Sequence, residues 1–206
     1  MTTSERSAFT ERLLEQFTPD KAEKLPAAFA KYEARFTGSH FERLADTDPN
    51  AITANDIVAV SALSVEIPAG VAVWLLSEGQ QRVSTLLAGA PIDVDLWEDP
   101  SLLAPDSDLW QLWGVLMTAC WPASKAGNGM GRTKLSKLLS AKRPRLVPVV
   151  DSVISTVLPS TTYWADFTEA LRDDGVRATI EDATATAPDH LSLLRRIDIA
   201  IWMLNH

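Results

Sequence analysis

Apolar positions recur at helical spacing over most of the chain. Thr18 is a candidate cap, Pro19 stands at the first helical position, and residues 19–36 predict one helix. Thr53 and Asp56 have the spacing of a capping box in front of an apolar block, which predicts a helix starting there. Residues 107–120 place leucines and tryptophans on one broad face before Pro122 ends the run. These patterns predict an all-α protein.

Helical spacing also appears in the second half of the chain and after residue 67. The predicted helices are a stretch starting at Pro68 and residues 148–158, 162–174 and 191–204. Gly175 is expected to end the third of these. Only residues 145–150 have strand composition, and the proline- and acid-rich residues 91–108 are the best candidate for a connection between two helical halves. We expect a single all-helical domain over residues 1–206, with room for two helical lobes and a cleft between them.

Composition narrows the class of protein further. Hydrophobic residues make up 46% and charged residues 22%, which is ordinary globular usage. One cysteine and three scattered histidines argue against a disulfide, a metal cluster and a zinc motif, so no metal is predicted. The first 17 residues lack the apolar core of a signal peptide, and no stretch reaches the roughly 18 apolar residues of a membrane span. The expected location is the cytoplasm, without a membrane partner.

Charge is unevenly distributed along the sequence. The formal net charge is -8, yet seven basic residues and no acidic one lie between residues 122 and 150. They are Lys125, Arg132, Lys134, Lys137, Lys142, Arg143 and Arg145. The remaining chain holds 12 basic and 27 acidic residues, a balance of -15. Such a segment either attracts phosphates of a nucleic acid or pairs with the acidic surface of the same protein.

Three glycines at alternate positions of residues 127–131 precede an apolar-periodic run that starts at Leu135. The pattern predicts a tight turn that enters a helix, because glycine permits positive φ and close backbone approach. Free N–H groups and the dipole make such a helix start an anion site. Arg132, Lys134 and Lys137 fall in the first turns, where positive charge is unfavourable without an external anion. A phosphate is therefore the expected ligand.

The segment 109–154 resembles the helix-hairpin-helix motif of the base-excision DNA glycosylase superfamily. In that motif a G-h-G turn opens the second helix, and residues 129–131 stand as Gly-Met-Gly. PVVDSVI at residues 148–154 matches the family's P-V-D-x-x-V/I, and Asp151 follows Leu139 by 12 residues. The convincing part of the resemblance covers about 30 residues and implies a glycosylase-like helical domain.

Three weaker signals lie outside this motif. Residues 57–67 are similar to an early helix of the same superfamily, with Glu66 where the family has a glutamine. The block at residues 142–153 and the last helix also resemble an uncharacterised actinobacterial family. Most tryptophans at helical spacing are expected in the core, whereas Trp121 beside the basic segment is a candidate for base stacking or gap filling, together with Glu66.

The resemblance implies roles for individual residues. Asp151 would be catalytic, because its charge stabilises an oxocarbenium-like sugar or orients a water; the same aspartate is also a good helix N-cap. The bifunctional members carry a lysine where this chain has Thr133, so lyase activity is not expected. No cofactor is implied beyond a structural monovalent cation at the hairpin. The residues expected to bind DNA are Gly129, Gly131, Arg132, Thr133, Lys134, Lys137, Lys142, Arg143 and Arg145.

Together these features predict a DNA-binding, helix-hairpin-helix repair protein. Its expected activity is a monofunctional DNA glycosylase that hydrolyses the N-glycosidic bond of a damaged or modified base flipped out of double-stranded DNA. Two alternatives remain: a non-catalytic module that grips nucleic acid with the same hairpin, and a protein-interaction domain that docks an acidic partner on the basic segment. The sequence indicates neither the lesion nor the oligomeric state.

Overall fold

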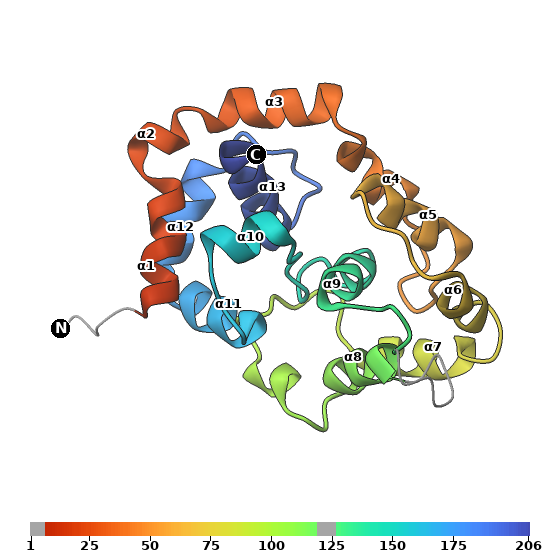
Figure 1. The fold of residues 1–206 in the computed structure, drawn as a ribbon. Helices are drawn as coiled ribbons and strands as arrows, with labels where there is room; N and C mark the ends of the chain where they lie inside the picture. Colours follow the sequence, from red (N-terminus) through yellow and green to blue (C-terminus); the bar gives the residue numbers. More distant parts are fainter. Residues whose placement is uncertain (1–6, 119–126) are drawn as a thin grey trace.

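The computed structural model describes residues 7–118 and 127–206 (Figure 1). Helices of varied length account for the regular structure of these residues, and no strand occurs among them. The all-α prediction is therefore confirmed. None of the helices in the two described ranges has the length and apolar character needed to cross a bilayer.

Short helices and two 3₁₀ turns form the first part of the chain. They are α1 (Ala8–Leu14), η1 (Glu15–Phe17), α2 (Pro19–Ala22), α3 (Leu25–Arg35), η2 (Thr37–His40), α4 (Phe41–Leu44) and α5 (Ala54–Ala62). The single helix predicted over residues 19–36 divides in two, because Pro26 lacks the N–H that would bond the Ala22 carbonyl in a continuous helix; it lies in the first turn of α3, where that N–H is not needed. The capping box is confirmed at α5, where Asp56 Oδ2 accepts from Thr53 N at 2.7 Å.

The rest of the described chain contains further α-helices and one 3₁₀ turn. They are α6 (Ala69–Leu75), α7 (Gln80–Gly89), η3 (Pro100–Leu103), α8 (Asp108–Thr118), α9 (Arg132–Ser140), α10 (Ser152–Val157), α11 (Tyr163–Arg172), α12 (Asp174–Ala183) and α13 (Leu193–Asn205). Gly175 does not end a helix as expected: Asp173 caps α12 by accepting from Gly175 N and Val176 N. Residues 145–150 form no strand, and most of their side chains are buried.

Two hydrophobic clusters organise the fold. One joins α1 and α3 to α10–α13 through residues such as Phe29 and Ile197, and the other joins α4–α9 through residues such as Leu87 and Leu138. Figure 1 shows α9 and α10 in the middle, between the N- and C-terminal helices on one side and α4–α8 on the other. The chain passes from the second cluster to the first between Val147 and Val150. The predicted motif therefore lies where the two clusters meet.

Candidate functional site

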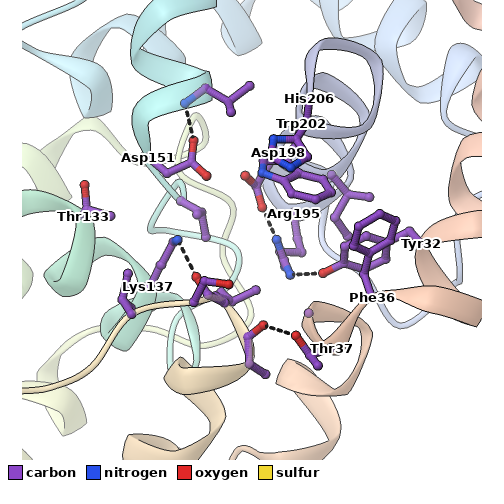
Figure 2. Close-up of a pocket in the computed structure, with 18 of the residues that line it drawn as sticks. Tyr32, Phe36, Thr37, Thr133, Lys137, Asp151, Arg195, Asp198, Trp202 and His206 are labelled. Atoms are coloured by element: carbon purple, nitrogen blue, oxygen red, sulfur yellow. Dashed lines mark hydrogen bonds and ion pairs between the residues drawn. The ribbon is translucent and has the colours of Figure 1, made fainter.

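A cleft of about 440 Å³ opens at the junction of the two clusters (Figure 2). Its walls come from α3, η2, the loop after α5, the first half of α9, the start of α10 and α13. Thr133, Lys137 and Asp151 line it, although they lie in two separate parts of the sequence motif. Asp198 from α13 completes a group of charged side chains in the same cleft.

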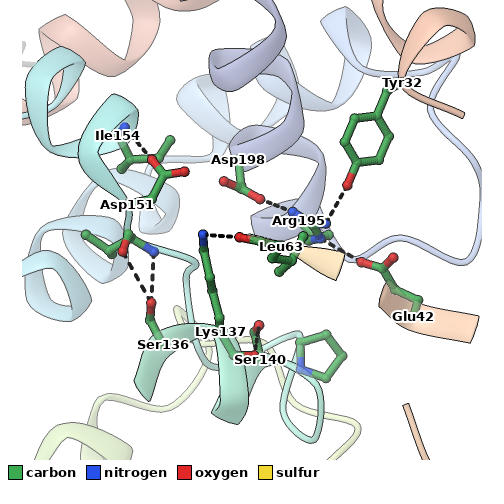
Figure 3. Close-up of polar contacts among 12 residues, drawn as sticks. Tyr32, Glu42, Leu63, Ser136, Lys137, Ser140, Asp151, Ile154, Arg195 and Asp198 are labelled. Carbon is green, nitrogen blue, oxygen red and sulfur yellow. Dashed lines mark hydrogen bonds and ion pairs between the residues drawn. The ribbon is translucent and has the colours of Figure 1, made fainter. Parts of the chain in front are cut away.

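Asp151 caps the start of α10 with one carboxylate oxygen and also lines the cleft. Its Oδ1 accepts from Val153 N at 2.9 Å and from Ile154 N at 3.0 Å, so it is the N-cap that the sequence predicts. The second carboxylate oxygen is directed into the cleft, toward Asp198 and Lys137 (Figure 3). The cap bonds hold the carboxylate in one position and leave one oxygen available to a ligand.

Lys137 faces the cleft from the middle of α9. Its Nζ donates to the Leu63 carbonyl at 2.8 Å, and only 6% of the residue is exposed. Burial lowers the pKa of this ammonium, whereas the charges of Asp151 and Asp198 act in the opposite direction. Lys137 was expected to contact the DNA backbone on the surface. The structure corrects this, because the amine lies inside the cleft between two carboxylates.

Arg195 on α13 anchors a polar network at the floor of the cleft (Figure 3). Its Nε donates to Glu42 Oε1 at 2.6 Å, its Nη2 donates to the Tyr32 hydroxyl at 2.8 Å, and its Nη1 pairs with Asp198. Desolvation raises the pKa of Asp198 to about 6, against the effect of Arg195. Sequence reasoning missed these residues. A charged pair spaced i,i+3 inside the apolar C-terminal helix was the available signal.

Aromatic rings form one wall of the cleft. The ring centroids of Phe36 and Trp202 lie 5.0 Å apart in an edge-to-face arrangement, and Trp202 stacks on His206 at 4.2 Å. All three residues line the cleft (Figure 2). A flat aromatic ligand would find stacking surfaces here, opposite the charged side chains.

The glycine turn before α9 forms as predicted, with one difference. Gly127 and Gly129 have φ values of 73° and 74°, a region that favours glycine. Gly131 has an ordinary φ of -94° and is the N-cap of α9, without a side-chain cap. A Cβ atom added at Gly131 would meet nothing within 4 Å. The first N–H groups of α9 are therefore open to an approaching anion, while the turn itself depends on the two earlier glycines.

Lys142 was predicted to contact DNA, but its side chain is buried and stabilises the fold. Its side chain is 1% exposed, and its Nζ lies 2.8 Å from Asp56 Oδ1, whose side chain is completely buried. The same ammonium donates to the carbonyls of Asp46 and Asp48 at 3.0 Å. All its donors are directed inward, so a phosphate in solution cannot reach them.

Arg143 and Arg145 also require correction. Arg143 is 1% exposed, and its guanidinium donates to backbone carbonyls and one side-chain oxygen. The acceptors are the carbonyls of Pro49, Leu87, Ala90 and Lys142 and Oδ1 of Asn50. Arg145 forms a bidentate ion pair with Asp95: its Nε donates to Oδ1 at 2.9 Å and its Nη2 donates to Oδ2 at 2.7 Å. This half of the basic segment pairs with the protein's own acceptors.

The remaining candidates divide between surface and cleft. Arg132 is exposed and Lys134 is partly exposed at the start of α9, next to Gly129 and Gly131, whereas Thr133 lines the cleft. Glu66 is exposed and does not line the cleft, and Trp121 lies outside the described residues. Within residues 7–118 and 127–206, no group of three or more histidine, cysteine or acidic side chains is arranged to hold a metal ion.

Comparisons with known proteins identify a family without assigning an activity. No curated protein and no solved structure matches the chain. The resemblance to DNA glycosylases and the actinobacterial origin of the family stay predictions. One family model matches residues 12–205, nearly the whole sequence. The chain therefore belongs to that family, described as a family of unknown function (DUF6308).

Proposed function

We propose that this protein binds DNA at the open start of α9 and hydrolyses the N-glycosidic bond of a nucleotide held in the cleft. One observation carries the proposal. Asp151 directs a carboxylate oxygen into a cleft that also contains Lys137 and Asp198, and the uncapped N-terminus of α9 lies beside it. A carboxylate in that position suits a reaction in which positive charge develops on a sugar.

The proposed reaction uses water and leaves the DNA strand intact. The bond between C1′ and the base nitrogen breaks, the base leaves with its bonding electrons and gains a proton, and a water supplies the hydroxyl at C1′. Asp151 stabilises the positively charged sugar and accepts a hydrogen bond from the attacking water. The Lys137 ammonium offsets part of the charge of the two carboxylates of the cleft, since both act on it electrostatically, and Arg195 pairs with Asp198.

Hydrolysis without strand cleavage is favoured by two features of α9. Thr133 places a hydroxyl in the cleft at the motif position where bifunctional relatives of the motif have an amine. Lys137 is one helical turn further on, and its amine already donates to the Leu63 carbonyl. This hydrogen bond holds the amine one helical turn away from the motif position of the nucleophilic lysine, although burial lowers its pKa.

The proposed DNA binding depends on few positively charged side chains. Among the described residues, Arg132 and Lys134 are the basic side chains beside the open turn, because Lys142 and Arg143 are buried and Arg145 is paired. Each phosphate contact contributes about 0.9 to the magnitude of the negative slope of log affinity against log salt, so two contacts predict a magnitude of about 2. The structural monovalent cation that the resemblance implies stays a prediction.

The substitution Asp151→Asn tests the chemistry. Asparagine is nearly as good an N-cap as aspartate, so folding and DNA affinity should persist while base release falls by about a hundredfold or more. The assay offers duplexes with uracil, alkylated, oxidised and bulky-modified bases, followed by mild alkali to reveal abasic sites. Asp173→Asn is the matched control, because it makes the same change at the N-cap of α12, outside the cleft.

Three results would overturn parts of the proposal. Equal base release by the parent and Asp151→Asn would remove Asp151 from the mechanism. DNA binding by the parent without release from any substrate would leave a non-catalytic nucleic-acid-binding module. Absence of any DNA binding would remove both and favour the protein-interaction alternative.

A further inference from the structure

A second pocket lies on the other side of the wall that carries the catalytic candidates. Its volume is about 260 Å³, and it lies among α8, α9 and α11. The segment 148–151 alternates between the two spaces: Val149 and Asp151 line the cleft, whereas Pro148 and Val150 line the pocket. The pocket and the cleft are thus neighbours separated by one stretch of backbone.

Helix α9 divides its side chains in the same way. Thr133 and Lys137 line the cleft, whereas Arg132 and Ser136 line the pocket. The N-cap Gly131 directly precedes Arg132, and all four residues lie within the first six positions of α9. A ligand that spans the start of α9 therefore has one space on each side of its contact with the helix.

The pocket is lined by large aromatic side chains. Trp164 packs against Trp113 with ring centroids 4.9 Å apart and against Trp110 at 5.7 Å, and Tyr163 adds a fourth ring. Trp110 remains 42% exposed, although Trp164 is only 8% exposed. The exposed part of Trp110 in this aromatic pocket gives a ligand an apolar surface to stack on.

A cation stands at the same opening. The guanidinium of Arg132 lies 5.8 Å from the ring centroid of Tyr163, and the residue is exposed. Within the two described ranges no carboxylate forms an ion pair with Arg132. Thr161 and Thr162 also line the pocket, and the Thr162 hydroxyl donates to Asp166 Oδ2 at 3.3 Å. The pocket therefore combines flat apolar surfaces with one positive charge that has no anionic partner in the described structure.

We infer that this pocket binds one nucleotide, with its base against the tryptophans and its phosphate on Arg132. Stacking of a base on aromatic side chains and a guanidinium on the phosphate are the usual means of holding a single-stranded nucleotide. The volume is slightly below that of pockets for drug-sized ligands, which suits a single base. The inference deepens the proposed function, since a strand held at the start of α9 places one nucleotide in the cleft and an adjacent one in the pocket.

Isothermal titration calorimetry with deoxyadenosine 5′-monophosphate tests the site directly. The intact protein should give saturable binding, and deoxyadenosine and deoxyribose 5-phosphate should each bind about tenfold or more weakly, because each lacks one of the two recognised groups. The tetranucleotide dA₄ distinguishes a strand from a free nucleotide, and it should bind more tightly than the monophosphate. Both probes failing to bind would overturn the inference, as would equal affinity for deoxyadenosine and its monophosphate.

Matched variants locate the bound nucleotide. Trp110→Ala and Arg132→Gln should each weaken binding of the monophosphate by about tenfold. Met117→Ala removes another exposed apolar side chain from α8, and Arg82→Gln removes an exposed charge from α7, so both should bind within about twofold of the parent. If Trp202→Ala abolishes binding and Trp110→Ala does not, the base occupies the cleft and the inference is wrong.

The same measurement separates this inference from the proposed chemistry. Asp151→Asn should retain the nucleotide affinity, because Asp151 lines the cleft and not the pocket. A parent protein that binds the monophosphate at Trp110 and releases no base would keep the binding site and discard the glycosylase activity. Loss of nucleotide binding in Asp151→Asn would instead contradict the placement of the nucleotide in the pocket.

Discussion

Two halves of the basic segment, the start of α9 and the residues that follow this helix, place their cations in opposite environments. At the start of α9, Arg132 and Lys134 face solvent, while immediately after α9, Lys142 and Arg143 are buried among carbonyl and carboxylate oxygens. A run of positive charge in a sequence is therefore not a positive surface. The number of cations available to an external partner is set by which of them the fold has already supplied with acceptors.

Helix polarity explains part of the difference. The last carbonyls of a helix lack partners and carry partial negative charge, so cations that follow α9 are favoured by the helix and can approach neighbouring backbone oxygens. Cations in the first turn face N–H groups and gain nothing from them. Lys142 and Arg143 find most of their acceptors in other segments, around residues 46–56 and 87–90, whereas Arg132 is left to an external anion or to the ring of Tyr163.

Arg143→Met is the substitution expected to change the stability of the protein most. The substitution keeps an apolar stem but removes the donors to the carbonyls of Pro49, Leu87 and Ala90. Buried acceptors without donors are costly, so we expect the free energy of unfolding to fall by about 4 kcal/mol or more. Urea denaturation followed by circular dichroism measures the change. Arg132→Met is the control, and a similar loss there would show that the two halves do not differ.

Asp198 gives an intermediate effect, because it is buried and paired yet faces the cleft. Its folded pKa of about 6 exceeds the usual value of 3.8, so the folded state binds the extra proton between these pH values. This group therefore contributes less stability as pH rises from 4 to 6, by about 2 kcal/mol. Arg195, Asp151 and Lys137 shape this titration, and Glu42 pairs with Arg195.

The measurement compares the parent with Asp198→Asn by urea denaturation across this pH range. The difference between the two free energies of unfolding isolates Asp198 from the other carboxylates of the chain. It should change steadily between pH 4 and 6 and stay constant above about pH 7. A constant difference over the whole range would show that Asp198 stays ionised in the folded state.

The smallest effect on stability is expected at the start of α9. Arg132→Gln and Lys134→Gln should each change the free energy of unfolding by less than about 0.5 kcal/mol, because both side chains reach solvent. Each should nevertheless lower the salt slope of duplex DNA binding by about 1, as expected for one lost phosphate contact. Fluorescence anisotropy at several salt concentrations measures the slope. An unchanged slope in both variants would place the phosphate contacts elsewhere.

Local signals predicted those parts of the fold that local chemistry determines. The capping box located α5 because Thr53 and Asp56 satisfy backbone groups of the first turn, and the glycine turn located α9 because its positive φ values favour glycine. Helix α7 was missed, since its N-cap Gly79 offers no side-chain bond and its apolar face is weak. Helix α12 was missed because Gly175 lies within its first turn, behind the Asp173 cap.

The candidate site was predictable only where it coincides with the motif. Asp151 and Thr133 follow from the motif spacing and do line the cleft. Arg195 and Glu42 could not be paired from the sequence, because 153 positions separate them. The inward direction of Lys142 was equally invisible, since its partner Asp56 lies in a distant helix. Charge pairs between distant segments depend on tertiary packing, which no local pattern encodes.

The hydrogen bonds of Arg143 order the C-terminal end of α9 when the chain folds, and not when a ligand binds. They fasten the residues after this helix to the carbonyls of segments around residues 49 and 87–90, so its C-terminal end cannot fray independently of those segments. The loss of conformational entropy then accompanies folding of the whole chain and is not repeated when a ligand arrives. The amides at the opposite end of α9 are held in place in advance, and an anion that binds there meets a preorganised partner.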